Sequence, residues 1–291
     1  MKYFIGVLQV LAAGICFGFL GIFARWGQQE GLSVGELLSW RFVFASILLW
    51  LGLLFLKPKV IRLSLKQICI SMLLGIFGYT VFSTLYFKSI EGISVPLAAM
   101  LLNTFPLFVN LGAHFILGER MTKLQFFCLM LASLGLVLLL WGGISVQKTT
   151  AVFFGLGSGI TYAIYVLVSG RAQSKVLPLS STLYVISATA MTLCLFHQPS
   201  PSHLMTLSSR GWLIVLGIAM VSTIAPITLF LSGLQKMKSA KASIIVMIEP
   251  VTASIAAAYF LHEIFSPIQM LGGVLALSGV LIDAFYRLEH S

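Results

Sequence analysis

Charged residues are scarce in this chain. Asp, Glu, Lys and Arg together make up 9% of its 291 residues, whereas a soluble domain carries about 25%. So few charges cannot cover a water-facing surface of this size, and the mean hydropathy of +1.03 agrees with that conclusion. The composition therefore excludes an ordinary soluble enzyme or binding domain and predicts an integral membrane protein.

Cysteine is also rare, and its placement excludes two further classes of protein. The four cysteines, Cys16, Cys69, Cys128 and Cys194, lie singly inside or at the edges of apolar runs. No C-x-x-C spacing occurs, so the sequence indicates neither a metal site nor a disulfide framework.

Catalytic and nucleotide-binding motifs are absent as well. The sequence contains no P-loop, which excludes direct drive by ATP. It contains no G-x-S-x-G and no H-E-x-x-H. We predict that His114 and His262 lie on opposite sides of the bilayer, so they cannot form one site. We therefore expect neither an enzyme nor a cofactor.

The net charge of +10 raises the possibility of a nucleic-acid partner. That function needs basic residues gathered on one folded face, but here they lie in short gaps between apolar runs. With the N-terminus inside, most Lys and Arg fall on the cytoplasmic side, and the other side holds Arg25, Lys88, Lys148 and Arg210. We expect a multi-pass protein of the cytoplasmic (inner) membrane with both termini in the cytoplasm, the lipid bilayer as its surroundings and no nucleic-acid partner.

Apolar runs of helix length fill the chain. A spanning helix needs about 20 mostly apolar residues, and runs this long and continuous do not fit the alternating strands of a membrane barrel. Ten such runs occur, at about 5–26, 35–56, 67–87, 94–117, 123–142, 151–171, 179–197, 211–233, 240–261 and 267–286. The predicted fold is therefore all-α, with ten transmembrane helices.

The segment 241–284 repeats an earlier part of the chain at an offset of about 144 residues. Both copies contain an apolar run, a short polar corner and a second apolar run. The matching pairs are Ala98 and Ala242, Pro106 and Pro250, Leu117 and Leu261, Glu119 and Glu263, Gln125 and Gln269, and Gly135 and Gly279. We predict two repeats, 1–145 and 146–291, each with five transmembrane helices. Because five is odd, the second must enter the membrane upside down, as in many secondary transporters.

These features resemble the EamA branch of the drug/metabolite transporter superfamily. The resemblance is carried by the Pro-bearing helix, the Glu corner and the Gly-rich last helix, at 104–139 and 248–282, and by Arg41 in the second span. His262 departs from it, because the pattern has Gly before the Glu, as Gly118 is before Glu119. The resemblance implies a carrier of small metabolites, often amino acids or their relatives.

Glu249 is the most informative single residue. It lies about eight residues after Lys241, roughly 12 Å along a helix and near the middle of the bilayer. A carboxylate there is costly unless it is paired, hydrated or protonated. Pro250 beside it interrupts the helix, and so does Pro106 in the first repeat. We hypothesise that Glu249 binds a substrate amine or carries a coupling proton; the alternative is a structural acid bonded to its neighbours.

Arg41 lies a short way into the second span. The simpler interpretation is that its side chain extends to the outer headgroups. The alternative is a gate or a clamp for a carboxylate, since guanidinium pairs with carboxylates through two hydrogen bonds.

Polar and aromatic groups at membrane depth are further candidates. Asn103, Asn110 and His114 share a face of the fourth span, and Asn103 is the candidate substrate residue among them. Hydroxyl groups come from Tyr79, Ser83 and Tyr86 in the third span and from Tyr162 and Tyr165 in the sixth, although most aromatics in spans serve packing. Of these we choose Tyr79, Ser83 and Tyr162.

The two acids at the polar corners are predicted to have a structural role. Glu119 and Glu263 come just before the last helix of each repeat, where the helix dipole stabilises an acid, so we expect them to be structural caps. Thr122 and Ser266 are suitable N-caps beside them.

We therefore predict a secondary active transporter that moves a small metabolite, an amino acid or related compound, across the cytoplasmic membrane by alternating access, with export favoured. Protons are a candidate coupling ion, and a monomer is compatible with the sequence. A lipid-linked or nucleotide-sugar carrier is an alternative, but its phosphates would require several basic residues in the cavity. A receptor or scaffold is another alternative, although no sizeable soluble segment is present for a partner.

Overall fold

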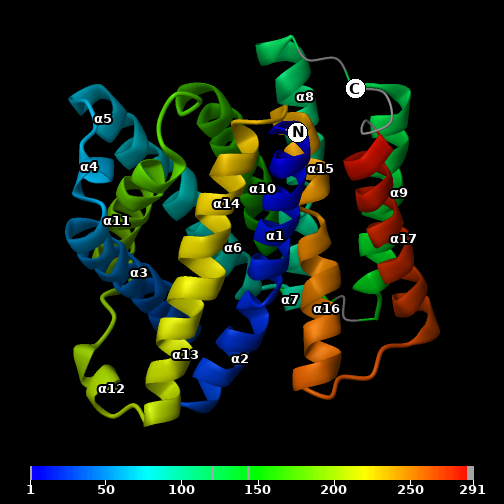
Figure 1. Ribbon diagram of the computed structural model, residues 1–291. Helices are drawn as coiled ribbons and strands as arrows, with labels where there is room; N and C mark the ends of the chain where they lie inside the picture. Colours follow the sequence, from blue (N-terminus) through cyan, green and yellow to red (C-terminus); the bar gives the residue numbers. More distant parts are fainter. Residues whose placement is uncertain (1, 119–120, 143–144, 287–291) are drawn as a thin grey trace.

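A computed structural model describes residues 2–118, 121–142 and 145–286. In this part of the chain every regular secondary-structure element is a helix (Figure 1). The β-type pairing there is a single isolated bridge between Ile93 and Val146. Nine helical segments there are long and apolar enough to span a membrane, and the shorter apolar helix Lys123–Leu139 is the tenth. The predicted all-α fold with ten transmembrane helices is confirmed.

Several spans consist of more than one helical element. The first half contains α1 (Lys2–Gly18), α2 (Leu20–Gln29), α3 (Val34–Leu56), α4 (Pro58–Ile61), α5 (Leu65–Leu73), η1 (Leu74–Thr80), α6 (Val81–Ile90), α7 (Val95–Leu102), α8 (Phe105–Leu117) and α9 (Lys123–Leu139). The second half contains α10 (Thr149–Ala172), α11 (Pro178–His197), α12 (Pro201–Met205), α13 (Ser209–Ala219), η2 (Met220–Ile224), α14 (Ala225–Leu234), α15 (Ser239–Ile245), α16 (Ile248–Phe260) and α17 (Pro267–Phe285).

The last helix of each half begins with the same device. Thr122 caps α9 and Ser266 caps α17, and each accepts a hydrogen bond from the backbone N–H three residues later. The residues there, Gln125 and Gln269, accept a bond in return from the N–H of the cap. These reciprocal bonds satisfy backbone donors that a helix start leaves unpaired.

The caps correct one expectation about the polar corners. Glu263 is exposed and lies three residues before Ser266, so it is not the cap of α17. A hydroxyl there can accept bonds from the helix without bringing a charge close to the membrane. Glu119 lies outside the described residues.

A wide helical turn interrupts the third and eighth spans at corresponding places. In η1 the Thr80 hydroxyl donates to the Gly75 carbonyl, at 3.0 Å. In η2 the Thr223 hydroxyl donates to the Ile218 carbonyl, at 2.9 Å. Such π turns insert an extra residue, and they are frequent at functional sites.

The fourth and ninth spans are broken at corresponding places too. The first breaks at residues 103–104, between α7 and α8, and the second at residues 246–247, between α15 and α16. Helix α8 then begins one residue before Pro106, and α16 begins two residues before Pro250. Proline lacks the N–H that would continue the helix. Asn110 then donates to the Pro106 carbonyl, at 2.8 Å, and Ser254 donates to the Pro250 carbonyl, at 2.9 Å.

Helix packing follows the same two-fold pattern. Helix α1 packs on α14 and α16, and α10 packs on α6 and α8. Helix α3 packs on α11, and α9 packs on α17. If each helix is replaced by its counterpart in the other half, the contacts of α1 become those of α10, and the α3–α11 and α9–α17 contacts stay the same. A duplicated unit is expected to show this symmetry. The exact boundary between 145 and 146 stays a prediction.

Helices α9 and α17 are in backbone contact through their glycines. A Cβ placed on Gly272 would lie 2.2 Å from the backbone N of Leu139, and one on Gly135 would lie 2.2 Å from that of Ala276. No side chain fits there, so close approach of the two helices depends on these glycines.

Changing Gly272 to alanine should loosen this helix pair. We expect Gly272→Ala to lower the unfolding midpoint in detergent by about 5 °C, because forcing an atom into a packed contact costs about 1–3 kcal/mol. The matched control is Gly273→Ala, whose Cβ would meet only Leu139 Cδ1, at 3.6 Å. It should leave the midpoint unchanged or raise it slightly, and equal losses in both variants would contradict this account of the contact.

The outer surface of the bundle is apolar. Large side chains such as Phe55, Phe153 and Leu195 are exposed by 70–81%. Patches of this kind are rare on soluble proteins and mark contact with a membrane or a partner. The interior holds one main apolar cluster to which both halves contribute.

Candidate functional site

A cluster of aromatic rings lies in the middle of the bundle, where the two halves meet. The Tyr79 ring centroid is 4.8 Å from that of Phe82 and 5.3 Å from that of Tyr165. The Tyr162 centroid is 4.6 Å from that of Phe82 and 4.7 Å from that of Phe105. We call these five residues, together with Phe42, the aromatic cluster; the Phe42 centroid is 5.4 Å from that of Tyr79.

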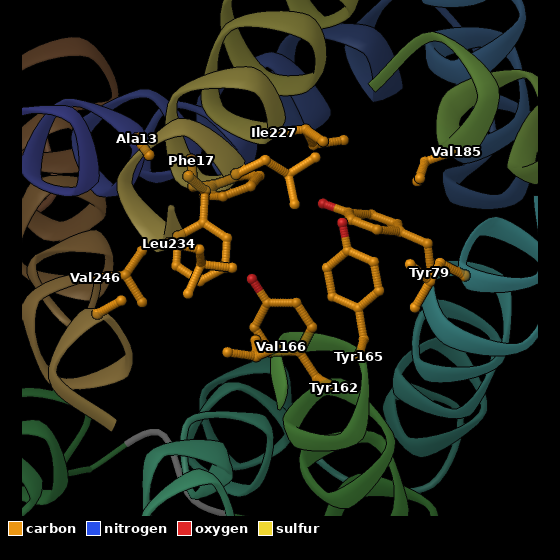
Figure 2. Packing of buried hydrophobic residues seen from close by; sticks show 14 of the residues in the cluster. Ala13, Phe17, Tyr79, Tyr162, Tyr165, Val166, Val185, Ile227, Leu234 and Val246 are labelled. Atoms are coloured by element: carbon orange, nitrogen blue, oxygen red, sulfur yellow. The ribbon is translucent and has the colours of Figure 1, made fainter. Parts of the chain in front are cut away.

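Figure 2 shows how the tyrosines of this cluster are oriented. Tyr79, Tyr162 and Tyr165 direct their hydroxyl oxygens into the space between helices that also holds Phe17 and Ile227. Phe17 belongs to α1 of the first half and Ile227 to α14 of the second half, so the hydroxyls from η1 and α10 face one helix from each half. Buried tyrosines combine an apolar ring with a polar end, and this arrangement presents three polar ends to one place.

The wide turn η1 positions Tyr79. Its neighbour Gly78 faces α10, where a Cβ would lie 2.7 Å from Tyr165 Cδ2. The absence of a side chain at this position lets the third span approach the sixth closely enough for the two tyrosine rings to meet.

Arg41 lies beside this cluster and is buried, with 7% of its surface exposed. Its guanidinium carbon lies 4.6 Å from the Phe42 ring centroid, and its Nε has no hydrogen-bond partner. It interacts electrostatically with Tyr79 and Glu249. The interpretation that Arg41 extends to the headgroups is therefore wrong: the side chain packs into the bundle, where an aromatic face partly compensates its charge.

Glu249 reaches the same place from the second half. It is the second residue of α16, directly after the helix break. Its charge acts on Arg41 and on Tyr79, Tyr86 and Tyr162. Within the described residues it makes no direct ion pair with Arg41. Electrostatic interactions thus connect four of the predicted site residues, namely Arg41, Tyr79, Tyr162 and Glu249.

The break in the ninth span explains why Glu249 is there. Its counterpart in the first repeat is Phe105, which begins α8 and belongs to the aromatic cluster. The residue at this point in each half therefore faces the centre, and only the second half carries an acid. The N-terminus of α16 also stabilises a negative charge, which keeps a structural role for Glu249 open.

Two other predicted residues are placed differently. Ser83 is buried on α6 with no hydrogen-bond partner for its Oγ. Asn103 sits in the break after α7, where its Nδ2 donates to the Ala99 carbonyl, at 2.9 Å. The single face of Asn103, Asn110 and His114 stays a prediction, because the break between α7 and α8 falls at residues 103 and 104.

The sequence interpretation missed three members of the cluster, Phe42, Phe82 and Phe105. Two weak signals could have found them. Phe82 lies three residues after Tyr79, which is the spacing of neighbours on one helix face. Phe105 occupies the position of Glu249 in the first repeat.

A buried polar network lies near the end of the bundle at which α5 and α11 begin. Gln173 follows α10, and its side chain accepts a hydrogen bond from Ser181 and donates one to Ser71, at 3.2 Å. Gln235 donates to the Gln173 carbonyl, at 2.9 Å. The network therefore links four spans, one of the first half through α5 and three of the second half through α10, α11 and α14. We call it the Gln173 network.

Metal-binding groups are not gathered in the described part of the chain. No cluster of three or more His, Cys, Asp or Glu side chains occurs among residues 2–118, 121–142 and 145–286.

A bundle of spanning helices in two related halves is the architecture of many secondary transporters. The sequence profile of the EamA-like transporter family matches residues 4–141 and 149–283. The chain belongs to this family, which confirms the resemblance seen in the sequence.

Relatives of known name agree with this class. An uncharacterized transporter of Archaeoglobus fulgidus is 28% identical, covering 97% of this chain and 96% of its own. The uncharacterized transporter YcbK of Bacillus subtilis is 26% identical, over 92% of this chain and 88% of its own. The threonine/homoserine exporter RhtA of Escherichia coli is 27% identical, over 77% of this chain and 74% of its own. One crystal structure shares the fold, with a TM-score of 0.80 over 98% of both chains at 16% identity.

Proposed function

We propose that this membrane transporter is a secondary active carrier that exports an amino acid or a related small metabolite across the cytoplasmic membrane. The observation that carries the proposal is that Arg41 and Glu249, from opposite halves, interact electrostatically beside one aromatic cluster. Ionisable residues within spanning segments are costly and mark substrate or ion pathways. Such a site at the interface of two related halves is the usual place for a transported substrate.

The two charges suit a zwitterion. The Arg41 guanidinium offers paired donors to a carboxylate, and the Glu249 carboxylate accepts bonds from an ammonium group. The tyrosine hydroxyls and ring faces between them would contact the rest of a small substrate. The name of the related exporter RhtA supports an amino acid and export. Asn103 and Ser83 stay candidates for a second layer around this site.

Alternating access would move the two halves against each other. We place both termini in the cytoplasm, so the Gln173 network lies at the cytoplasmic end and closes it. Pro106 and Pro250 mark the breaks that let α7–α8 and α15–α16 bend. With the cytoplasmic end closed, the substrate would leave to the outside.

Protons are the proposed coupling ion. A carboxylic acid that takes up a proton loses the charge that opposes its burial, and a bound ammonium group would compete with that proton. Glu249 could therefore exchange substrate for a proton in each cycle, which is the requirement for an antiporter.

The function itself is tested by counterflow. Vesicles that contain the purified protein are loaded with unlabelled threonine, homoserine or another amino acid. They should accumulate the labelled compound from outside, and vesicles without the protein should not. Absence of counterflow for every compound would contradict the proposed substrate class.

Opening of the cytoplasmic end should become easier in Gln173→Ala. The variant leaves the Ser181 hydroxyl without its acceptor and removes one of the two hydrogen bonds of Ser71, which still donates to the Gln67 carbonyl. An unsatisfied buried group costs about 1–3 kcal/mol. We expect maleimide to label a cysteine placed at Ser169 about tenfold faster in this variant, in a background without native cysteines.

The matched control for this labelling experiment is Gln147→Ala. Gln147 is an exposed residue of the same type outside the network. It should leave the labelling rate unchanged. An unchanged rate in Gln173→Ala would show that the network is not a gate.

A further inference from the structure

Six basic side chains are exposed at the end of the bundle where α5 and α11 begin. Four belong to the connection between α3 and α5, and two belong to the end of α10 and the turn after it: Lys57, Lys59, Arg62, Lys66, Arg171 and Lys175. Neither residues 57–66 nor residues 171–177 include an Asp or Glu. We call these six residues the basic patch.

Hydrogen bonds hold the two segments of the basic patch beside each other. Near the start of α11, the Ser180 hydroxyl donates to the Val60 carbonyl, and the Tyr184 hydroxyl donates to the Ile61 carbonyl, at 2.9 Å. The side chains of Val60 and Ile61 pack on the main apolar cluster. The Gln173 network ties the turn before α11 to α5. The backbone of the short helix α4 is therefore fixed against the second half, and its basic neighbours extend away from the core.

Exposed apolar side chains border the basic patch. The exposed fraction is 81% for Phe55, 80% for Leu56, 81% for Leu65 and 59% for Leu177. Each lies at the end of a spanning helix, where a membrane would surround it with acyl chains. The neighbouring basic residues then stand at the level of the lipid headgroups. A nucleic acid or a soluble acidic protein would not cover these apolar side chains, so the border favours a lipid.

The orientation of the chain explains only part of this arrangement. Cytoplasmic loops are generally rich in Lys and Arg, and that rule accounts for positive charge on one side. It does not require that basic segments from both halves be joined by hydrogen bonds, or that exposed apolar side chains border them. Groups of about four to eight basic residues beside a spanning helix are typical of binding to anionic headgroups.

We propose that the basic patch binds the phosphate groups of anionic phospholipids, whose acyl chains lie against Phe55, Leu56 and Leu65. A headgroup bound there joins α4 of the first half to the turn after α10 of the second half, beside the Gln173 network. This binding does not depend on which substrate the protein transports.

Competition between two lipids tests the proposal. The full-length protein in detergent is mixed with equal amounts of phosphatidylglycerol and phosphatidylcholine that carry the same acyl chains, and the retained lipids are counted by native mass spectrometry. We expect the wild type to retain about fivefold more phosphatidylglycerol, the order expected when one basic residue meets an anionic headgroup. Equal retention of the two lipids by the wild type would overturn the proposal.

A triple variant locates the binding. Lys59→Gln, Arg62→Gln and Lys175→Gln together should make the retention of the two lipids nearly equal, and these exposed changes leave the hydrogen bonds of α11 in place. A variant that keeps the preference for phosphatidylglycerol would contradict the proposed location.

Two controls separate the patch from general charge attraction. Arg25→Gln, Lys88→Gln and Arg210→Gln together remove the same charge from exposed positions outside the patch, and they should leave the lipid preference unchanged. Inorganic phosphate added to the wild type should not displace phosphatidylglycerol. An equal loss in the control variant, or displacement of the lipid by phosphate, would contradict a lipid site at the basic patch.

Discussion

Glu249→Gln is expected to abolish substrate movement driven by a pH gradient while counterflow of the same substrate continues. The amide keeps the size and the hydrogen-bonding ability of the side chain but cannot exchange a proton. Counterflow needs only a binding site that faces both sides in turn, so it separates the coupling step from binding. We expect gradient-driven uptake in vesicles to fall by at least about tenfold, with counterflow reduced by less.

The matched control for this substitution is Glu263→Gln. Glu263 is an exposed acid at the repeat position of Glu119, outside the bundle centre, and its loss should change neither rate. If Glu249→Gln retains gradient-driven uptake with the pH dependence of the wild type, Glu249 is a structural acid at the N-terminus of α16, and the proton acts elsewhere.

Arg41→Gln should weaken binding of carboxylate-bearing substrates. The guanidinium is buried beside Phe42 and Tyr79 and has an Nε–H without a partner, so it is free to pair with an incoming carboxylate. A charge-assisted hydrogen bond contributes about 1.5–3 kcal/mol, and the KM of an amino acid should therefore rise by about tenfold or more. The amino alcohol that lacks the carboxylate should show no such change.

A double variant of Arg41 and Glu249 provides a second test of this prediction. Because Arg41 and Glu249 interact electrostatically, the double variant should lose less binding than the sum of the single losses. Arg210→Gln is the control, since Arg210 is exposed at the start of α13. Strictly additive losses, or an equal loss in Arg210→Gln, would show that Arg41 does not contact the substrate.

The fold could be predicted from the sequence almost completely, for a physical reason. In a bilayer every backbone polar group must be satisfied within the segment, so continuous apolar runs can only be helices. The duplicated pattern around Pro106 and Pro250 then related the two halves. The wide turns η1 and η2 were not predicted, because π turns depend on local packing and have no composition signal of their own.

The site could be predicted only in part. Glu249 stands out because a carboxylate deep in an apolar run is costly, and that signal is local. The position of Arg41 depends on which way its side chain turns, and this is decided by Phe42 and by helices distant in the sequence. The signal at Asn103 is weaker for a related reason: the break between α7 and α8 falls at residues 103 and 104, where helical periodicity no longer fixes the direction of a side chain.

The most direct test of the account is uptake of labelled threonine and homoserine into vesicles that contain the wild-type protein, with and without an imposed pH gradient. The account predicts that both amino acids are moved by the protein and that the gradient drives them against their own concentration difference. Movement that only equalises the concentrations, with the gradient present or absent, would contradict secondary active transport and leave a passive carrier.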